Sequence, residues 1–164
     1  MAPRVLAGVW GDEHRLRAPT PGAAEAREPG FVIYLLDTNI CIYALKNRPA
    51  EVLARLQEVG RGAVALSVIT VLELRQGAEK SQQREASHSR LDLFLSPMVI
   101  LPFDEEAALT GARLRAHLER QGTPIGDLDS LIAAHALARD LVLVTNNLRE
   151  FERVPGLQTE NWVA

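Results

Sequence analysis

The sequence of 164 residues has little cysteine, no long apolar run and no excess of positive charge. Its one cysteine, Cys41, excludes an intrachain disulfide framework and leaves too few thiolates for a structural zinc site, so we expect a reducing, cytoplasmic environment. No apolar run approaches the roughly 18 residues that a membrane-spanning helix needs. The net charge of −3 and the pI of about 5.8 exclude a generically basic nucleic-acid binder, so any nucleic-acid site must be local.

The composition indicates one globular domain preceded by an irregular segment. A chain of this length suits a single domain, and 47% hydrophobic with 24% charged residues is ordinary for a folded protein. Residues 1–30 are rich in Pro and Gly, and their apolar residues show no period, so we expect a flexible leader there. An alternative is that this leader is translated upstream sequence and that the natural start lies near Val32. The domain is expected to span residues 31–164.

From residue 31 onward, short apolar runs alternate with longer amphipathic segments. The run FVIYLL at 31–36 suits a strand that is buried on both faces. Further strands are expected at 63–66, 99–101 and 141–145. Helices are expected at 40–45, 49–59, 67–76, 82–95, 104–121 and 128–138. Because strands separated by helices require crossover connections, the pattern predicts an α/β domain with a mostly parallel central sheet of about four to five strands covered by helices.

Three acidic residues occupy positions that can meet at one edge of this sheet. Asp37 directly follows the first strand, and Asp129 lies in the first turn of a helix that continues as the apolar run LIAAHALA. Glu73 lies on the polar edge of an otherwise apolar helix, and the polar residues 145–147 follow the last confident strand. Ligands of open α/β sheets bind beyond the carboxyl ends of the strands, so we expect these positions to converge.

Converging carboxylates have a chemical consequence. They would repel one another in a partly buried cleft, and at least one would take up a proton unless a cation neutralised the cluster. All-oxygen ligation suits Mg²⁺ or Mn²⁺, whereas Zn²⁺ would need His or Cys at closer spacing. Mg²⁺ keeps several waters, so a few carboxylates hold it, and a bound water can attack a phosphodiester. The pattern predicts metal-assisted phosphate chemistry.

Each of these residues also has a structural interpretation. Asp37 can be the N-cap of a helix, and Glu73 can be half of a salt bridge. Asp127 and Asp129 both lie where negative charge favours a helix N-terminus, and we assign the capping role to Asp127. His135 lacks metal-ligand spacing and a matched nucleophile, so we expect it to be packed rather than catalytic. Neither GxGxxG nor GxxxxGK[ST] occurs, which disfavours a nucleotide-binding loop.

Three long blocks of the chain resemble a known family. They are LLDTNICIYALKNRPAEV, SVITVLELRQGAEKS and GTPIGDLDSLIAAHALARDLVLVTNNLREFERVPGL. In this order they resemble the blocks of a PIN-domain ribonuclease, specifically a VapC-type toxin of bacterial toxin–antitoxin pairs, over about residues 32–164. The resemblance implies a PIN-like fold and assigns Asp37, Glu73 and Asp129 as metal-binding acids.

Two departures from the family pattern bear on the site. Asp127 stands where the family often has Pro, so an additional carboxylate borders the site. Asn147 stands where many members have a fourth acid, and Glu150 lies nearby in sequence. Asn147 can orient a water or phosphate by hydrogen bonds but cannot supply charge, and we retain it as a candidate catalytic residue.

The resemblance implies a homodimeric endoribonuclease that depends on Mg²⁺ or Mn²⁺. It also implies a small VapB-type antitoxin that inhibits the enzyme by forming a hetero-oligomer with it. Members of similar pattern cut initiator tRNA in the anticodon loop, which makes that tRNA the expected substrate. In a hydrolytic mechanism Asp37, Glu73 and Asp129 would hold the metal, which aligns the scissile phosphate and activates a water. Local Lys and Arg would grip RNA phosphates, and exposed loop bases would be the target.

Three other classes are compatible with parts of the pattern. A phospho-receiver domain predicts a Lys after the last core strand, but LVLVTNNLREFERV contains none and Glu73 would be unexplained. A haloacid-dehalogenase-like phosphatase requires a second Asp where Asn39 stands. A catalytically silent PIN module that serves as an interaction platform is supported only by Asn147.

Overall fold

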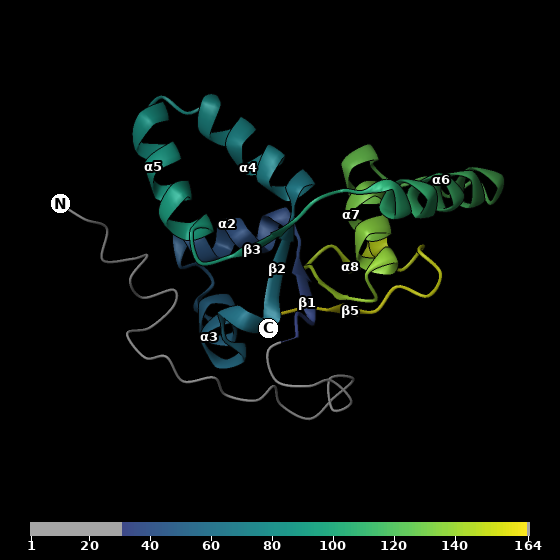
Figure 1. Ribbon diagram of the computed structural model, residues 1–164, viewed down its shortest axis with the longest axis horizontal. Coiled ribbons are helices and arrows are strands. Elements are labelled where there is room, and N and C mark those ends of the chain that lie inside the picture. Colours follow the sequence, from purple (N-terminus) through teal and green to yellow (C-terminus); the bar gives the residue numbers. More distant parts are fainter. Residues whose placement is uncertain (1–30, 164) are drawn as a thin grey trace.

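The structure of the chain is a computed structural model that describes residues 31–163 (Figure 1). The expectations for residues 1–30 lie outside the described residues. The strands are β1 (Tyr34–Leu36), β2 (Val64–Ser67), β3 (Val99–Leu101), β4 (Val142–Val144) and β5 (Thr159–Glu160). The helices are α2 (Thr38–Lys46), α3 (Ala50–Val59), α4 (Val68–Glu79), α5 (Arg84–Leu95), α6 (Glu105–Arg120), α7 (Asp127–Ala138) and α8 (Leu148–Phe151), with a short 3₁₀ turn η1 (Arg61–Ala63).

The five strands form one parallel sheet in the order β3-β2-β1-β4-β5. Tyr34 of β1 pairs with Val64 on one side and with Val142 on the other, so β1 is the central strand. The chain builds β2 and β3 outward on one side of β1 and then crosses to build β4 and β5 on the other. The predicted parallel α/β architecture is confirmed, and the strand order reverses at β1, where ligands of such sheets bind.

Helices cover both faces of the sheet, and alternate residues of β1 point toward opposite layers of helices. Tyr34 and Leu36 belong to the apolar cluster beneath α2–α5, whereas Leu35 belongs to the cluster beneath α6 and α7. Figure 1 shows these two groups of helices on opposite sides of the sheet. Burial on both faces explains why the three inner strands, β1, β2 and β4, consist almost entirely of apolar residues.

The helix starts follow the capping residues that the sequence offers. Ser67 Oγ accepts from the Ile69 N–H at 3.1 Å to begin α4, and Asp104 Oδ1 accepts from the Ala107 N–H at 3.0 Å to begin α6. The expected end of α4 before Gly77 is wrong, because Gly77 keeps helical backbone and the helix runs to Glu79. The sequence analysis also missed α8 and β5, which are four and two residues long.

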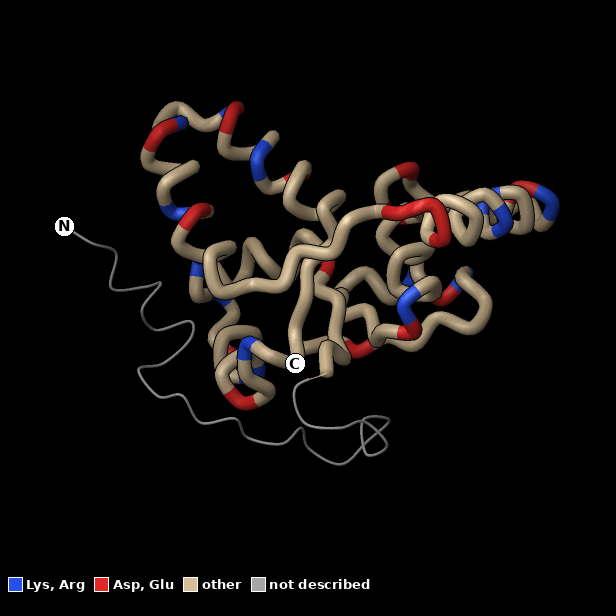
Figure 2. Tube along the Cα trace, viewed as in Figure 1, with Lys and Arg blue, Asp and Glu red and all other residues tan. Residues whose placement is uncertain are grey.

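The surface of the described residues has no single basic face. Figure 2 shows Lys and Arg interspersed with Asp and Glu along the outer helices. Within the described part of the chain, no helix combines the length and the apolar character needed to cross a membrane. Cys41 is buried in the core beneath α2, where burial raises the pKa of its thiol well above the ordinary value.

Candidate active site

Asp37 lies at the carboxyl end of the central strand and is almost fully buried, with 4% of its surface exposed. Its Oδ1 accepts from the Thr38 N–H at 2.8 Å, so the residue is also the N-cap of α2. Its Oδ2 accepts from the Thr145 hydroxyl at 2.8 Å. Burial raises the pKa of Asp37 above its usual value, although both hydrogen bonds favour the charged form. The N-capping interpretation of Asp37 is therefore confirmed, and its role as a metal ligand stays a prediction.

Glu73 projects from α4 toward the same strand end. The Thr38 hydroxyl donates to Glu73 Oε1 at 2.8 Å, so one residue, Thr38, is bonded to both Asp37 and Glu73. Among residues 31–163, no ion pair holds the Glu73 carboxylate, and a structural salt bridge does not explain it.

Asp129 lies in the first turn of α7, on the opposite cover of the sheet. Burial, followed by the negative charges of Asp37, Glu150 and Glu73, raises the pKa of Asp129 to about 6. Burial is the main cause of this raised pKa, and the negative charges of the three other acids add to it. The meeting of Asp37, Glu73 and Asp129 around one metal position stays a prediction.

Glu150 of α8 supplies the charge that Asn147 lacks. Its Oε1 accepts from the Gly126 N–H at 2.6 Å, and its Oε2 accepts from Asn147 Nδ2 at 3.0 Å. The Gly126 N–H, followed by the Asn147 amide, lowers the pKa of Glu150. A Cβ on Gly126 would lie 3.3 Å from Asp129 Oδ2 and 3.5 Å from Glu150 Oε1, so this glycine lets both carboxylates approach the turn.

The capping role predicted for Asp127 is wrong. Gly126 is the N-cap of α7 and makes no side-chain cap, while the Asp127 side chain is 95% exposed and lies 3.7 Å from Arg115. The physical reason is that α7 begins at Asp127 itself, so Gly126 occupies the N-cap position and Asp127 is the first helical residue. His135 is buried with its Nδ1 2.8 Å from Ser67 Oγ and stacks edge-on against Phe103, in keeping with its expected packing role.

The donor set fits a hard divalent cation. Within residues 31–163, no group of three or more His, Cys, Asp or Glu side chains is positioned to hold a metal ion. By their chemistry, Asp37, Glu73, Asp129 and Glu150 offer only oxygen donors, and a cation would offset the burial and the like charges that raise the pKa of Asp129. Mg²⁺ needs only one or two direct carboxylates because it retains water ligands, so Asp37, Glu73 and Asp129 are sufficient candidates.

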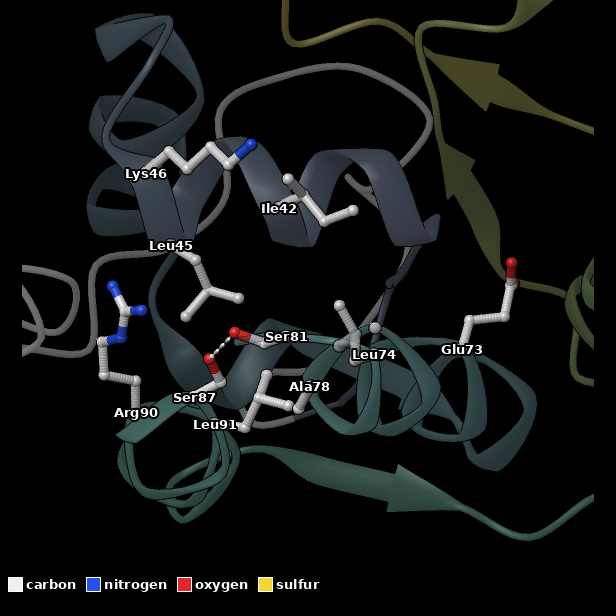
Figure 3. A pocket seen from close by; sticks show the side chains of 11 residues that line it. Ile42, Leu45, Lys46, Glu73, Leu74, Ala78, Ser81, Ser87, Arg90 and Leu91 are labelled. Carbon is white, nitrogen blue, oxygen red and sulfur yellow. Dashed lines mark hydrogen bonds between the residues drawn. The ribbon is translucent and has the colours of Figure 1, made fainter. Parts of the chain in front are cut away.

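A groove extends from Glu73 between α2, α4 and α5 (Figure 3). Its volume is about 560 Å³. Aliphatic side chains such as Leu45, Leu74 and Leu91 line its middle, and Lys46 and Arg90 lie at the end away from Glu73. The groove is therefore acidic at the site, apolar in the middle and basic at its far end.

Comparisons with known proteins identify the family of the chain. The PIN domain model matches residues 34–157. A tRNA(fMet)-specific endonuclease VapC from Shigella flexneri is 47% identical over 129 residues, which cover 79% of this chain and 97% of that protein. Ribonuclease VapC2 from Haemophilus influenzae is 48% identical over 130 residues, covering 79% of this chain and 98% of that protein. DNA-bound VapBC from Salmonella typhimurium has a TM-score of 0.77 at 43% identity, covering 80% of this chain and 99% of that chain. The chain belongs to the PIN domain family, and its relatives there are VapC ribonucleases.

Proposed function

We propose that the chain is a metal-dependent endoribonuclease toxin of the cytoplasm that cleaves initiator tRNA and is neutralised by a VapB-type antitoxin. The observation that carries this proposal is that Thr38 is hydrogen-bonded to both Asp37 and Glu73, while the carboxylates of Asp129 and Glu150 lie against Gly126. Relatives named as VapC ribonucleases, one of them as a tRNA(fMet)-specific endonuclease, support the same reaction.

The chain's own residues prepare the site for this chemistry. Asp37, Glu73 and Asp129 would hold Mg²⁺ or Mn²⁺, which when bound supplies charge stabilisation at the phosphate and a more acidic water. Thr38 and Thr145 fix the orientation of the Asp37 carboxylate through hydrogen bonds to its two oxygens. Because a cleft of carboxylates repels RNA, cations outside it must attract the backbone, and a single-stranded loop is the shape that can enter.

The test uses antitoxin-free protein and total cellular RNA. The protein is incubated with Mg²⁺, with Mn²⁺ or with EDTA, and new 5′ ends are mapped by sequencing. We expect discrete ends in the anticodon loop of initiator tRNA that appear only with metal. Discrete metal-dependent ends in another RNA would reject the tRNA substrate alone, and folded protein that cuts nothing with metal would favour the silent PIN module.

The antitoxin is proposed to act at the acidic end of the groove. Its simplest device is an Arg or Lys that pairs with the carboxylates, because these attract a cationic side chain as well as a metal ion. The solved VapBC complexes among the relatives support an antitoxin partner. Metal and antitoxin would then compete, so saturating Mg²⁺ at constant ionic strength should weaken antitoxin binding. An unchanged affinity would mean that the antitoxin covers the cleft from elsewhere.

We propose that exposed apolar residues near the edge strand β3 form the interface with a second copy of the chain. Val68 and Leu72 lie one turn apart on α4, and Val99 and Ile100 lie on β3; all four are exposed. Light scattering of the antitoxin-free protein should give the mass of a homodimer, and Leu72→Lys should shift it toward the monomer. A wild-type monomer at micromolar concentration would reject the homodimer.

A further inference from the structure

The first turn of α7, which carries Asp129, is held from outside by one arginine of α6. Arg115 Nε donates to Ser130 Oγ at 2.7 Å, and its Nη2 donates to the Asp127 carbonyl at 2.9 Å. The Ser130 hydroxyl donates to the same Asp127 carbonyl at 2.6 Å, which closes a small network. The two residues that Arg115 holds lie on either side of Asp129 in sequence.

The approach of the two helices explains why Arg115 reaches this turn. A Cβ on Gly111 of α6 would lie only 3.4 Å from the Cβ of Ala134 on α7, so the helices approach closely there. Arg115 is one helical turn after Gly111, and Ser130 is one turn before Ala134. In an antiparallel pair these two positions face each other, because residues four apart share a helix face.

This turn needs external support because its own sequence provides little. Its N-cap is Gly126, which has no side chain to bind the first N–H groups. The Asp129 carboxylate lies against this turn, since its Oδ2 would be 3.3 Å from a Cβ on Gly126, and its position therefore depends on how the turn is held. A planar guanidinium that binds a backbone carbonyl and a buried hydroxyl together restrains the turn.

We propose that Arg115 is a positioning residue that fixes the Asp129 carboxylate toward the metal and the scissile phosphate. The proposal rests on the function proposed above. Arg115 acts through the α7 turn rather than by charge neutralisation, because its closest carboxylate is the exposed one of Asp127 at 3.7 Å. The same geometry leaves the chemistry itself to the carboxylates.

Arg115→Lys is the decisive variant, since lysine keeps the positive charge but cannot bind Ser130 and Asp127 in one planar fork. We expect kcat for RNA cleavage to fall about tenfold or more with KM nearly unchanged. We also expect Mn²⁺ to bind about tenfold more weakly to the RNA-free protein, measured by calorimetry, as is typical when a support of a metal ligand is lost. Arg113→Lys, a change at an exposed position of the same helix, is the matched control and should alter neither quantity.

Other outcomes overturn the proposal. A raised KM with unchanged kcat and Mn²⁺ affinity would make Arg115 an RNA contact, and a lower melting temperature alone would make it a structural residue. If Arg115→Lys does not fold, Ser130→Ala removes the Nε partner and must weaken Mn²⁺ binding in the same way. Wild-type protein that cleaves no RNA would reject the proposed function, while the Mn²⁺ titrations would still decide the role of Arg115.

Discussion

The four acids of the site do not share one protonation behaviour. Burial raises the pKa values of Asp37 and Asp129, whereas hydrogen bonds from Gly126 and Asn147 lower that of Glu150. Glu150 therefore stays charged at neutral pH and is itself one cause of the raised pKa of Asp129. A cation would favour the charged form of Asp129 in two ways. It would offset the cost of burying the carboxylate, and it would screen the repulsion between that carboxylate and Glu150.

Asp129→Asn tests the ligand role directly. Since a charged oxygen is replaced by a weaker neutral one, we expect cleavage in Mg²⁺ to fall by at least about a hundredfold. Asp127→Asn is the control, because the Asp127 carboxylate is 95% exposed and its carbonyl is retained; cleavage should change less than about twofold. Initial rates on the mapped RNA measure both, and a fully active Asp129→Asn protein would remove Asp129 from the mechanism.

Glu150 and Asn147 can be separated by charge. In Glu150→Gln the amide oxygen can still accept from the Gly126 N–H, but the negative charge is lost, so cleavage should fall about tenfold or more and the pKa of Asp129 should decrease. Asn147→Ala removes one hydrogen bond and no charge, so its effect should be smaller. Rates and carboxyl titration by NMR measure these changes. The reverse order of activities would show that the Asn147 amide acts on the substrate itself.

Among the secondary-structure elements, the start of α7 is where distant segments meet. Gly126 brings the turn against Glu150 of α8, and Arg115 of α6 holds it from the other side. In Gly126→Ala the added Cβ would lie 3.3 Å from Asp129 Oδ2 and 3.5 Å from Glu150 Oε1. Both contacts are ends of side chains, which can move, so the melting temperature in EDTA should change little.

Activity should respond more strongly to Gly126→Ala. Displacing the Asp129 carboxylate by a few tenths of an ångström disturbs the geometry on which metal binding would depend, so we expect cleavage and Mn²⁺ affinity to fall about tenfold. Thermal unfolding in EDTA and calorimetric Mn²⁺ titration check the two halves of this prediction. A destabilised protein with normal Mn²⁺ affinity would contradict it.

The sequence predicted elements whose signal is local and missed contacts that only the fold creates. Leu35 and Leu36 sit in a continuous apolar run, and Ser67 is a strong N-cap, so β1 and the start of α4 could be predicted. Asp127 satisfied the same capping preference, yet α7 begins at Asp127 itself and Gly126 is its N-cap. The Gly126 N–H is bound by Glu150, which lies 24 residues later, and no local pattern reports a contact from another helix.

Asp37 and Asp129 could be predicted as site residues because each lies beside an apolar segment whose structure the sequence indicates. Asp37 could be predicted because it follows a strand that burial on both faces identifies, and Asp129 because it opens an apolar helix. Arg115 carried no such signal, since an arginine on an amphipathic helix is usually only a solvated charge. β5 is two residues long and is defined by pairing with β4, so a period cannot reveal it.

At the scale of the whole molecule, the site joins the two helical covers of the sheet. Glu73 comes from α4 on one cover, Asp129 and Glu150 come from α7 and α8 on the other, and Asp37 comes from the strand end between them. A cation held by acids from both layers of helices would link these layers across the sheet edge. Metal binding should therefore stabilise the whole domain against unfolding rather than one loop.

This coupling predicts that metal reverses the effect of Asp129 on stability. In EDTA the pKa of Asp129 is about 6 in the folded state and 3.8 in the unfolded state, so the folded state binds more protons between these two pH values. The free energy of unfolding therefore falls as the pH rises from about 4 to about 6, because the folded protein then has to ionise a buried carboxyl group. Relative to Asp129→Asn, the wild-type protein should be equally stable near pH 4 and less stable at pH 7. After allowance for solvent screening of this half-buried group, the difference is about 1–2 kcal/mol.

Saturating Mg²⁺ should invert that difference, because the cation favours the carboxylate and binds the variant poorly. At a metal concentration about 100 times the dissociation constant, wild-type protein gains about 2.7 kcal/mol, enough to make it the more stable of the two at pH 7. Urea unfolding of both proteins between pH 4 and pH 8, in EDTA and in Mg²⁺, measures the four curves. The wild-type protein could instead be more stable than Asp129→Asn in EDTA as well as in Mg²⁺. Asp129 would then be a structural carboxylate, because a buried salt-bridge partner stabilises the fold whether or not metal is present.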